Sequence, residues 1–265
     1  MNIKLRIKDK REMIVKHVVE ISELDICLFV DTGLSKMGNV SMKSWAEKFG
    51  FKWIHNRSEK KHGGIGFLVK EGIPIEELRT EGSWVLWVRV GSDPPLFIGG
   101  AYRPPSLAIG TVLNLLKCET NKLRLKGEVV VMGDFNARIG SLPSQVDGLA
   151  GEAVADSLVS YHRKSADSKT TREGRELIEC MNGLNLVVLN GVLEEAEMTC
   201  QHWMGSSVID LVCVAGRLMG RVENLTVWTD DLSSDLSDHL LVTLEIIQRR
   251  VVGSNSSSSS SSSSS

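Results

Sequence analysis

The chain has 265 residues, of which 42% are hydrophobic and 24% charged, and its formal net charge is −2. These values are typical of a folded globular protein and exclude intrinsic disorder for the body of the chain. The longest apolar runs have the length of a strand, well short of the ~18 residues that a membrane span needs. Because Ser256 to Ser265 are all serine, we expect one domain over residues 1–250 and a disordered serine-rich tail over 251–265.

Charge and cysteine usage limit the environment and the partners of the chain. Residues 1–80 hold 15 Lys and Arg against 11 Asp and Glu, and the remainder holds 16 against 22, so DNA contact would need a local groove or a bound cation. The five cysteines form no Cys-x-x-Cys pair, and the N-terminus lacks an apolar signal region, which predicts an intracellular protein, nuclear or cytoplasmic. Cys200 and His202 lack a second ligand pair, which argues against structural zinc.

Taken in chain order, the pattern begins with an amphipathic helix over residues 10–21 and a doubly buried strand over 25–30. Ser41 is the expected N-cap of a helix that ends at Phe49. Further strands are expected over 65–69, 83–90, 96–102, 128–132, 184–189, 208–214, 225–228 and 240–247, and further helices over 111–123 and 171–183. Residues 141–169 are polar and weakly periodic, which predicts a long loop. Interleaved strands and helices favour an α/β or α+β fold with mixed sheets.

Polar residues follow two of the buried strands. Asp134 and Asn136 come directly after the strand over 128–132, and Asp31 ends the apolar run over 26–30. A carboxylate can hold a metal ion or a water molecule, and an Asn amide can donate to a phosphate oxygen. Each residue taken alone also fits an ordinary polar turn or cap.

Two further motifs carry acids near the C-terminal strands. Asp210 interrupts an apolar strand, where a charge is costly unless it is paired, and His239 is a candidate partner that the pairing would keep protonated. The neighbouring Asp238 and His239 alone would also fit a strand-entry turn with a solvated histidine. Together the strand-end acids predict a site for a hard divalent cation, Mg²⁺ with Mn²⁺ as a substitute, and therefore phosphate-ester hydrolysis.

The motifs in this order resemble the endonuclease/exonuclease/phosphatase (DNase-I-like) superfamily, and most of all the apurinic-endonuclease-type endonuclease domain of non-LTR (LINE-type) retrotransposons. The resemblance covers about residues 2–247 and is carried by Asp25–Thr32, Gly63–Ile65, Tyr102–Pro105, Gly133–Ala137, Ser207–Asp210 and Ser237–His239. It implies a four-layer α/β sandwich in which two packed mixed β-sheets are flanked by helices. It also implies a monomeric, Mg²⁺-dependent endonuclease that nicks DNA and has no membrane partner.

The resemblance also implies a role for each matching residue, and the residues should converge at one edge of the sandwich. The implied catalytic residues are Asp134, Asn136, His239, Asp210 and Tyr102. The implied metal ligands are Asp31, Asn2 and Asp238, and the implied phosphate or DNA contacts are Ser207, Arg103 and Asn136. Asp134 would deprotonate the attacking water, and in-line attack would leave a 3′-hydroxyl and a 5′-phosphate.

Two departures from the family pattern keep other readings open. Only Met1 precedes Asn2, so the first strand of the family is expected to be missing. Asp31 stands where the family has Glu, which retracts the carboxylate by about one C–C bond, ~1.5 Å. The alternatives are a catalytically inactive, truncated retrotransposon-derived domain and a phosphatase of the same superfamily.

Overall fold

The computed structural model describes residues 24–56, 63–78, 80, 82–91, 94–147, 158–229 and 237–247. The expected helix over 10–21, Asn2 and the serine-rich tail over 251–265 lie outside the described residues, and so does the expectation of a missing first strand. No helix in the described part of the chain combines the length and the apolar character that a membrane crossing requires.

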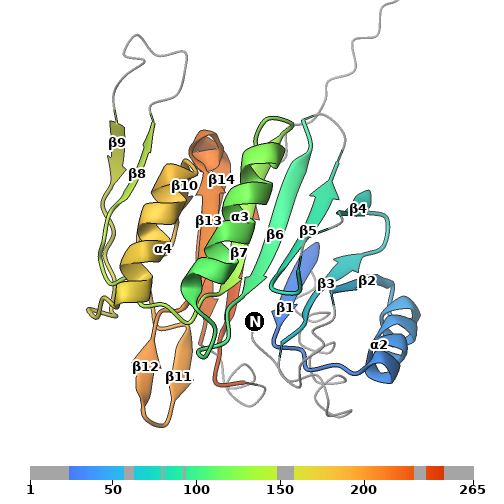
Figure 1. Ribbon diagram of the computed structural model, residues 1–265. Helices are drawn as coiled ribbons and strands as arrows, with labels where there is room; N and C mark the ends of the chain where they lie inside the picture. The colour runs from blue at the N-terminus through green and yellow to red at the C-terminus, as the bar shows by residue number, and fades with distance from the viewer. Residues whose placement is uncertain are drawn as a thin grey trace, which may run out of the picture.

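A six-stranded mixed sheet forms the centre of the molecule (Figure 1). Its strands, in spatial order, are β10 (Leu186–Val188), β13 (Asp210–Ala215), β7 (Glu128–Asp134), β6 (Leu96–Tyr102), β5 (Val85–Val90) and β4 (Ile75–Leu78). β6 and β7 are parallel, and the helix α3 (Ile109–Leu123) connects them, whereas the other pairs are antiparallel. α3 and α4 (Arg172–Gly183) cover one face of this sheet.

A smaller antiparallel sheet packs on the opposite face, with the order β1 (Ile26–Val30), β3 (Ile65–Lys70) and β2 (Phe51–Asn56). Successive residues of a strand point to opposite faces. Leu28 and Phe67 accordingly meet the large sheet, while Phe29 and Leu68 pack against α2 (Lys36–Lys48). The run over 26–30 is buried on both faces as expected, and helix, sheet, sheet and helix give the expected four layers. The expectation of two mixed sheets is wrong for the smaller one, whose pairs are all antiparallel in the described residues.

The remaining elements are short. β14 (Val222–Trp228) and β15 (Leu241–Ile246) form a separate antiparallel ribbon, and a 3₁₀ helix, η1 (Gly216–Arg221), precedes it. β11 (Cys200–His202) and β12 (Gly205–Ser207) form a hairpin that projects beyond the end of the large sheet (Figure 1).

Two expectations about local structure are wrong. Residues 141–169 are not all loop, because they contain the hairpin of β8 (Ser144–Asp147) and β9 (Leu158–Tyr161). Tertiary hydrogen bonds fix β8: the Ser144 hydroxyl accepts the backbone N–H of β10 at 3.0 Å. The helix expected to start after Ser41 begins earlier, because the Ser35 hydroxyl accepts the N–H of Gly38 and caps α2.

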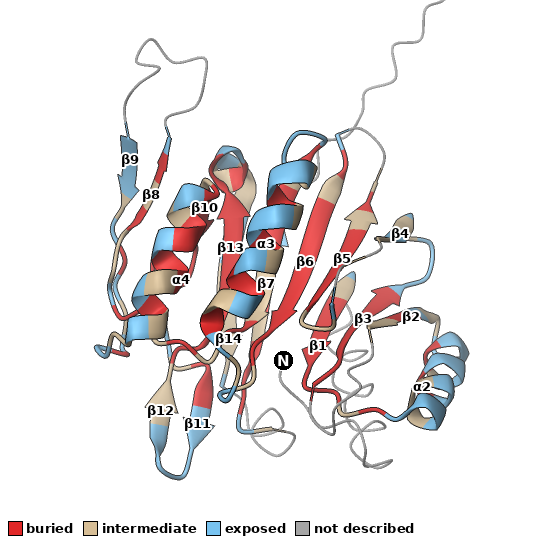
Figure 2. Ribbon diagram, viewed as in Figure 1, coloured by how far each residue is buried: buried red, intermediate tan, exposed pale blue. Residues whose placement is uncertain are grey.

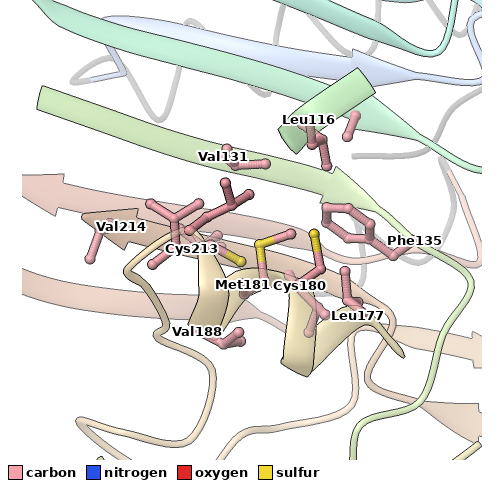
Figure 3. Close-up of a cluster of buried hydrophobic side chains, with 14 of the residues drawn as sticks. Leu116, Val131, Phe135, Leu177, Cys180, Met181, Val188, Cys213 and Val214 are labelled. Atoms are coloured by element: carbon pink, nitrogen blue, oxygen red, sulfur yellow. The ribbon is translucent and has the colours of Figure 1, made fainter. Parts of the chain in front are cut away.

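The main core lies between the large sheet and its two helices, and its buried residues line the inner faces of α3 and α4 (Figure 2). Leu116 of α3, Met181 of α4 and Val131 of β7 are among the fully buried side chains there (Figure 3). Burying a side chain of this size contributes about 1.5–3 kcal/mol relative to exposing it. This core fixes the three central strands β6, β7 and β13, so that the strand ends that carry Tyr102, Asp134 and Asp210 lie together at one end of the sheet.

Gly133 permits the close contact between β7 and β6, and its replacement by alanine should be strongly destabilising. Its φ is +152°, and a Cβ would lie 1.9 Å from the carbonyl oxygen of Ala101. We expect Gly133→Ala to lower the free energy of unfolding by about 3 kcal/mol, the upper end for overpacking a well-packed core. Gly110→Ala is the matched control, because a Cβ there meets nothing within 4 Å, and it should cost no stability. Urea denaturation of both variants checks this, and equal midpoints would contradict it.

Candidate active site

Three predicted site residues lie side by side where three strands of the large sheet meet. Asp134, at the end of β7, is directly opposite Tyr102 of β6 and directly opposite Asp210 of β13. Asp134 is completely buried, and the other two are nearly so. Two carboxylates that face each other across neighbouring strands repel, so this arrangement requires a positive charge close by.

His239 supplies that charge. Its Nδ1 lies 2.8 Å from Oδ2 of Asp210, and its Nε2 lies 4.0 Å from Oδ2 of Asp134. Burial lowers the pKa of His239, but the hydrogen bond and charge of Asp210, a hydrogen bond with Cys200 and the charge of Asp134 outweigh burial and raise it to about 11. The predicted pairing of His239 with Asp210 is thus present, and the ring is an imidazolium at neutral pH.

Asn136 orients the Asp134 carboxylate. Its backbone N–H donates to Oδ1 of Asp134 at 2.9 Å and its Nδ2 donates to Oδ2 at 3.0 Å. Asn136 has a φ of +46°, a left-handed conformation that Asn tolerates better than most residues. Both oxygens of the carboxylate are therefore held in a fixed plane.

Arg103 is nearly buried, and its guanidinium donates to backbone carbonyl oxygens. Nη1 donates to the carbonyl of Asn136 at 2.9 Å, and Nε donates to the carbonyl of Leu107 at 2.8 Å. The carbonyl of Arg103 in turn accepts from Nδ2 of Asn136 at 2.9 Å. These contacts make Arg103 a positioning residue for the Asp134–Asn136 turn, and its predicted phosphate contact stays a prediction.

Asp31 joins the site from the small sheet. It is nearly buried, it has a φ of +50°, and its Oδ1 accepts the N–H of Gly63 at 2.6 Å. Burial raises the pKa of Tyr102 far above its usual range, and the charges of Asp31 and Asp134 and a hydrogen bond to Asp31 raise it further. Tyr102 is therefore a neutral phenol that donates to Asp31, and it connects the two sheets.

The other predicted residues lie at the margin of this site. Asp238 is exposed and lies beside Cys200 and His239. Ser207 is partly buried at the end of β12, opposite Cys200. The structure thus brings together Tyr102, Asp134, Asn136, Asp210 and His239, with Asp31 joined through Tyr102. Metal binding by Asp31 and Asp238 and phosphate contact by Ser207 stay predictions.

Sequence reasoning missed the residues that hold Asp210 in place. The hydroxyl oxygen of Thr199 accepts the N–H groups of Ile209 and Asp210, at 3.1 and 3.0 Å. Nδ2 of Asn190 donates to the carbonyl of Asp210, and its Oδ1 accepts from Val212. Asn190 at the end of an apolar run was the available signal, because a buried amide needs partners. Thr199 gave no signal, because a lone threonine fits any strand.

An ion pair between the buried Asp167 and the partly exposed Arg138 fixes the segment before Asp210. Nε of Arg138 donates to the Asp167 carboxylate at 2.8 Å, and the same carboxylate accepts the backbone N–H of Val208 at 3.0 Å. Burial raises the pKa of Asp167, but the hydrogen bonds from Arg138, Val208 and Lys169 outweigh it, so its pKa lies below the usual range.

Replacing Asp167 by asparagine should destabilise the protein by about 1.5–3 kcal/mol, because the buried side chain loses its charged hydrogen bonds, whereas the remaining Arg138 is partly exposed to water. Since the folded pKa is lowered, the stabilising effect is present above the unfolded value of ~3.9 and is lost as the pH falls. Glu176→Gln is the control, because its ion pair with Arg172 on α4 is exposed and worth at most about 0.5 kcal/mol. Denaturant titrations at pH 7 and at acid pH measure the free energy of unfolding of both variants. A loss of stability in Asp167→Asn no larger than in Glu176→Gln would contradict the expectation.

The donor atoms of the site suit a divalent cation. Carboxylate oxygens of Asp134 and Asp210 and a ring nitrogen of His239 lie within 4.8 Å of one another, and while His239 is protonated only the carboxylates can bind a cation. Carboxylate oxygens predominate at this edge once Asp31 is included, and hard cations such as Mg²⁺ prefer oxygen ligands. The acidic groups present here could therefore hold a divalent metal ion.

Comparison with known proteins decides the family. A family model described as endonuclease–reverse transcriptase matches residues 96–243, which is 148 of the 265 residues and spans the site from Tyr102 to His239. The chain belongs to this family. Its members are endonucleases, so the expected superfamily is confirmed. No curated protein sequence matches the chain.

Solved structures confirm the fold. The chain is similar to the endonuclease domain of TRAS1, a telomere-specific non-LTR retrotransposon, at 15% identity over 94% of this chain and 97% of that one, with a TM-score of 0.67. It is similar to the 3′-5′ exonuclease NExo from Neisseria meningitidis, at 15% identity over 92% and 97%, with a TM-score of 0.67. It is also similar to an AP endonuclease from Archaeoglobus fulgidus, at 13% identity over 92% and 96%, with a TM-score of 0.65.

Proposed function

We propose that the chain is a Mg²⁺-dependent phosphodiester hydrolase that nicks DNA, as in target-site cleavage by a retrotransposon. The observation that carries the proposal is the buried row of Tyr102, Asp134 and Asp210 with the His239 imidazolium between the two acids. A fixed carboxylate beside a fixed cation suits a reaction in which water is deprotonated while charge develops on a phosphate. Membership in an endonuclease family supports the same chemistry.

Each side chain has a task that follows from its contacts. Asp134, held by Asn136, takes the proton of the attacking water, and the His239 imidazolium donates to a phosphate oxygen. Tyr102 would contact the same phosphate by turning its hydroxyl from Asp31. Asp210 keeps His239 charged and oriented. A Mg²⁺ held by Asp31 and Asp238 would neutralise the charge that develops on the phosphate.

The conformation of Asp31 bears on its replacement of the family's glutamate. A φ of +50° is better tolerated by Asp than by Glu, because a short polar side chain can hydrogen-bond locally. The carboxylate is already held by the Gly63 N–H and the Tyr102 hydroxyl. The shorter residue therefore suits the backbone that this chain has at the end of β1.

The β11–β12 hairpin is the proposed DNA contact. Trp203 and Met204, at its tip, are 86% and 72% exposed, and Cys200 at its base forms a β-bridge with His239. Exposed aromatic rings stack on bases, and apolar wedges enter base steps. DNA as the substrate is also supported by a structure of similar fold, the 3′ phosphatase NExo from Neisseria bound to a product DNA hairpin.

Nicking of supercoiled plasmid tests the proposal. We expect relaxed circles with Mg²⁺, or with Mn²⁺ in its place, and none with EDTA. Ligation of the products without further treatment would verify the 3′-hydroxyl and 5′-phosphate ends. Trp203→Ala should slow nicking while leaving the unfolding midpoint unchanged. Hydrolysis of a small phosphomonoester without nicking would favour the phosphatase, and no hydrolysis of either substrate would favour the inactive domain.

A further inference from the structure

Cys200 and His239 face each other across a β-bridge between segments that are far apart in the sequence. The backbone hydrogen bonds flank this pair: the N–H of Gln201 donates to the backbone carbonyl of Asp238 at 2.7 Å, and the N–H of Leu240 donates to the backbone carbonyl of Thr199 at 2.8 Å. In antiparallel pairing, this pattern marks a position without direct hydrogen bonds, where the Cα atoms approach to about 4.5 Å and the side chains are closest.

The two side chains and Asp238 form a group with three kinds of donor. The Cys200 sulfur, an Asp238 carboxylate oxygen and a His239 ring nitrogen all lie within 4.8 Å of one another. Cys200 and His239 are buried, Asp238 is exposed, and a side-chain hydrogen bond joins the thiol and the imidazole. The group is therefore assembled without a ligand and has one side open to solvent.

This donor set prefers other metal ions than the carboxylates of Asp134 and Asp210 do. Mg²⁺ takes oxygen ligands, whereas thiolate and imidazole select Zn²⁺ and other thiophilic divalent ions. Asp210 holds Nδ1 of His239, so the metal would be bound through Nε2, which lies 4.0 Å from Oδ2 of Asp134. A carboxylate that accepts from the other ring nitrogen of a ligating histidine is the usual support of a zinc site and fixes the ring orientation.

We infer that Cys200, Asp238 and His239 form an inhibitory site for a thiophilic divalent cation, Zn²⁺ in the first place. The three ligands leave a fourth position for water. Binding releases the thiol proton and the Nε2 proton to solvent, and the metal bonds to Sγ and Nε2 replace them. Because His239 would then bind the metal and no longer be an imidazolium, the phosphate of the substrate would lose its hydrogen-bond donor, and nicking would stop. The binding site stands on the geometry alone, whereas the inhibition rests on the proposed function.

The other cysteines provide the internal comparison. Burial raises the pKa of Cys27 and Cys213 to about 12 and that of Cys180 to about 11, so these thiols stay protonated. Cys118, on α3, is exposed. Within the described ranges, Cys200 is the cysteine that belongs to such a cluster.

Cobalt(II) absorption tests the site directly, without any measurement of activity. Titrating the full-length chain with CoCl₂ should produce a sulfur-to-cobalt charge-transfer band in the near ultraviolet, which ZnCl₂ removes. Cys200→Ser should abolish the band, and Cys118→Ser should retain it. Asp238→Asn should weaken Zn²⁺ binding at least about tenfold, since changes even to groups behind the ligands cost 10–100-fold. Near-UV circular dichroism verifies that each variant is folded.

The absence of a band at millimolar Co²⁺, or its retention in folded Cys200→Ser, would overturn the site.

The inhibition is tested on Mg²⁺-supported nicking, and the rate of each variant with zinc is compared with its own rate without zinc. The ZnCl₂ concentration for half-inhibition should rise at least about tenfold in Cys200→Ser relative to Cys118→Ser. Equal values would overturn the inhibitory role. A chain that shows the band but never nicks DNA would contradict the proposed function and leave the metal site in place.

Discussion

Replacing Asp134 by asparagine should reduce plasmid nicking by about 10²–10⁴-fold, the range for loss of a general base. The substitution keeps the size of the side chain and one oxygen for the Asn136 N–H, which donates to Oδ1 at 2.9 Å. It removes the group that accepts the proton of the attacking water. It also removes one of the two negative charges that face His239. Single-turnover nicking under saturating Mg²⁺ measures the chemical step.

The matched control is Asp147→Asn, on the exposed end of β8, which should nick at the wild-type rate. Asp134→Asn should remain folded, because the repulsion with Asp210 that it relieves across the strand pair offsets the lost hydrogen bond from Nδ2 of Asn136. Wild-type nicking by Asp134→Asn in a folded preparation would remove Asp134 from the mechanism, and another group would have to act as the base.

Replacing His239 by glutamine should destabilise the protein by about 3–5 kcal/mol at neutral pH, because the buried Asp210 carboxylate loses its charged partner. The pKa of His239 is raised from its ordinary value of 6.5 to about 11. A raised pKa in the folded state means that the stabilising effect is complete below the unfolded value and is lost as the pH rises through the folded one. The stability of the wild-type protein should therefore fall between about pH 6.5 and pH 11.

Urea midpoints recorded from pH 6 to pH 10.5 would reveal this loss, which His239→Gln should not show. His202→Gln is the control: His202 is exposed on β11, its Nδ1 accepts the N–H of Met204, and the variant should keep the wild-type profile. NMR titration should also find the His239 ring charged well above pH 6.5. A ring that titrates at or below 6.5 would show that the Asp210 contact does not hold the proton.

Local pattern was sufficient to predict the parts of the fold that local physics decides. The run over 26–30 is apolar throughout because β1 is buried on both faces, and Asp134 and Asp210 were visible as acids at the ends of buried strands. His239 followed as a site residue from the need of the Asp210 carboxylate for a charged partner. Family resemblance supplied the role of Tyr102, which a single tyrosine cannot indicate.

What the sequence could not predict depends on contacts between distant segments. The β8–β9 hairpin is weakly patterned and is fixed by groups such as Ser144, which bonds to β10. Cys200 appeared close only to His202, because the bridge that places it opposite His239 joins residues 39 positions apart. The short β11 and β12 offered three residues each, too few for a period to emerge.

The hydrogen bond between Tyr102 and Asp31 gives the molecule a thermodynamic linkage between substrate binding and the docking of its two sheets. Asp31 directly follows β1 of the small sheet, whereas Tyr102 and Asp134 belong to the large sheet, so the site exists only while the sheets are closed on each other. A ligand that contacts both sides binds only the closed state and stabilises it by about 2.7 kcal/mol at a hundred times its Kd. Amide hydrogens of β1 and β3 would then exchange more slowly in the bound protein. Conversely, a substitution that loosens the small sheet would weaken substrate affinity without touching any group that takes part in the reaction.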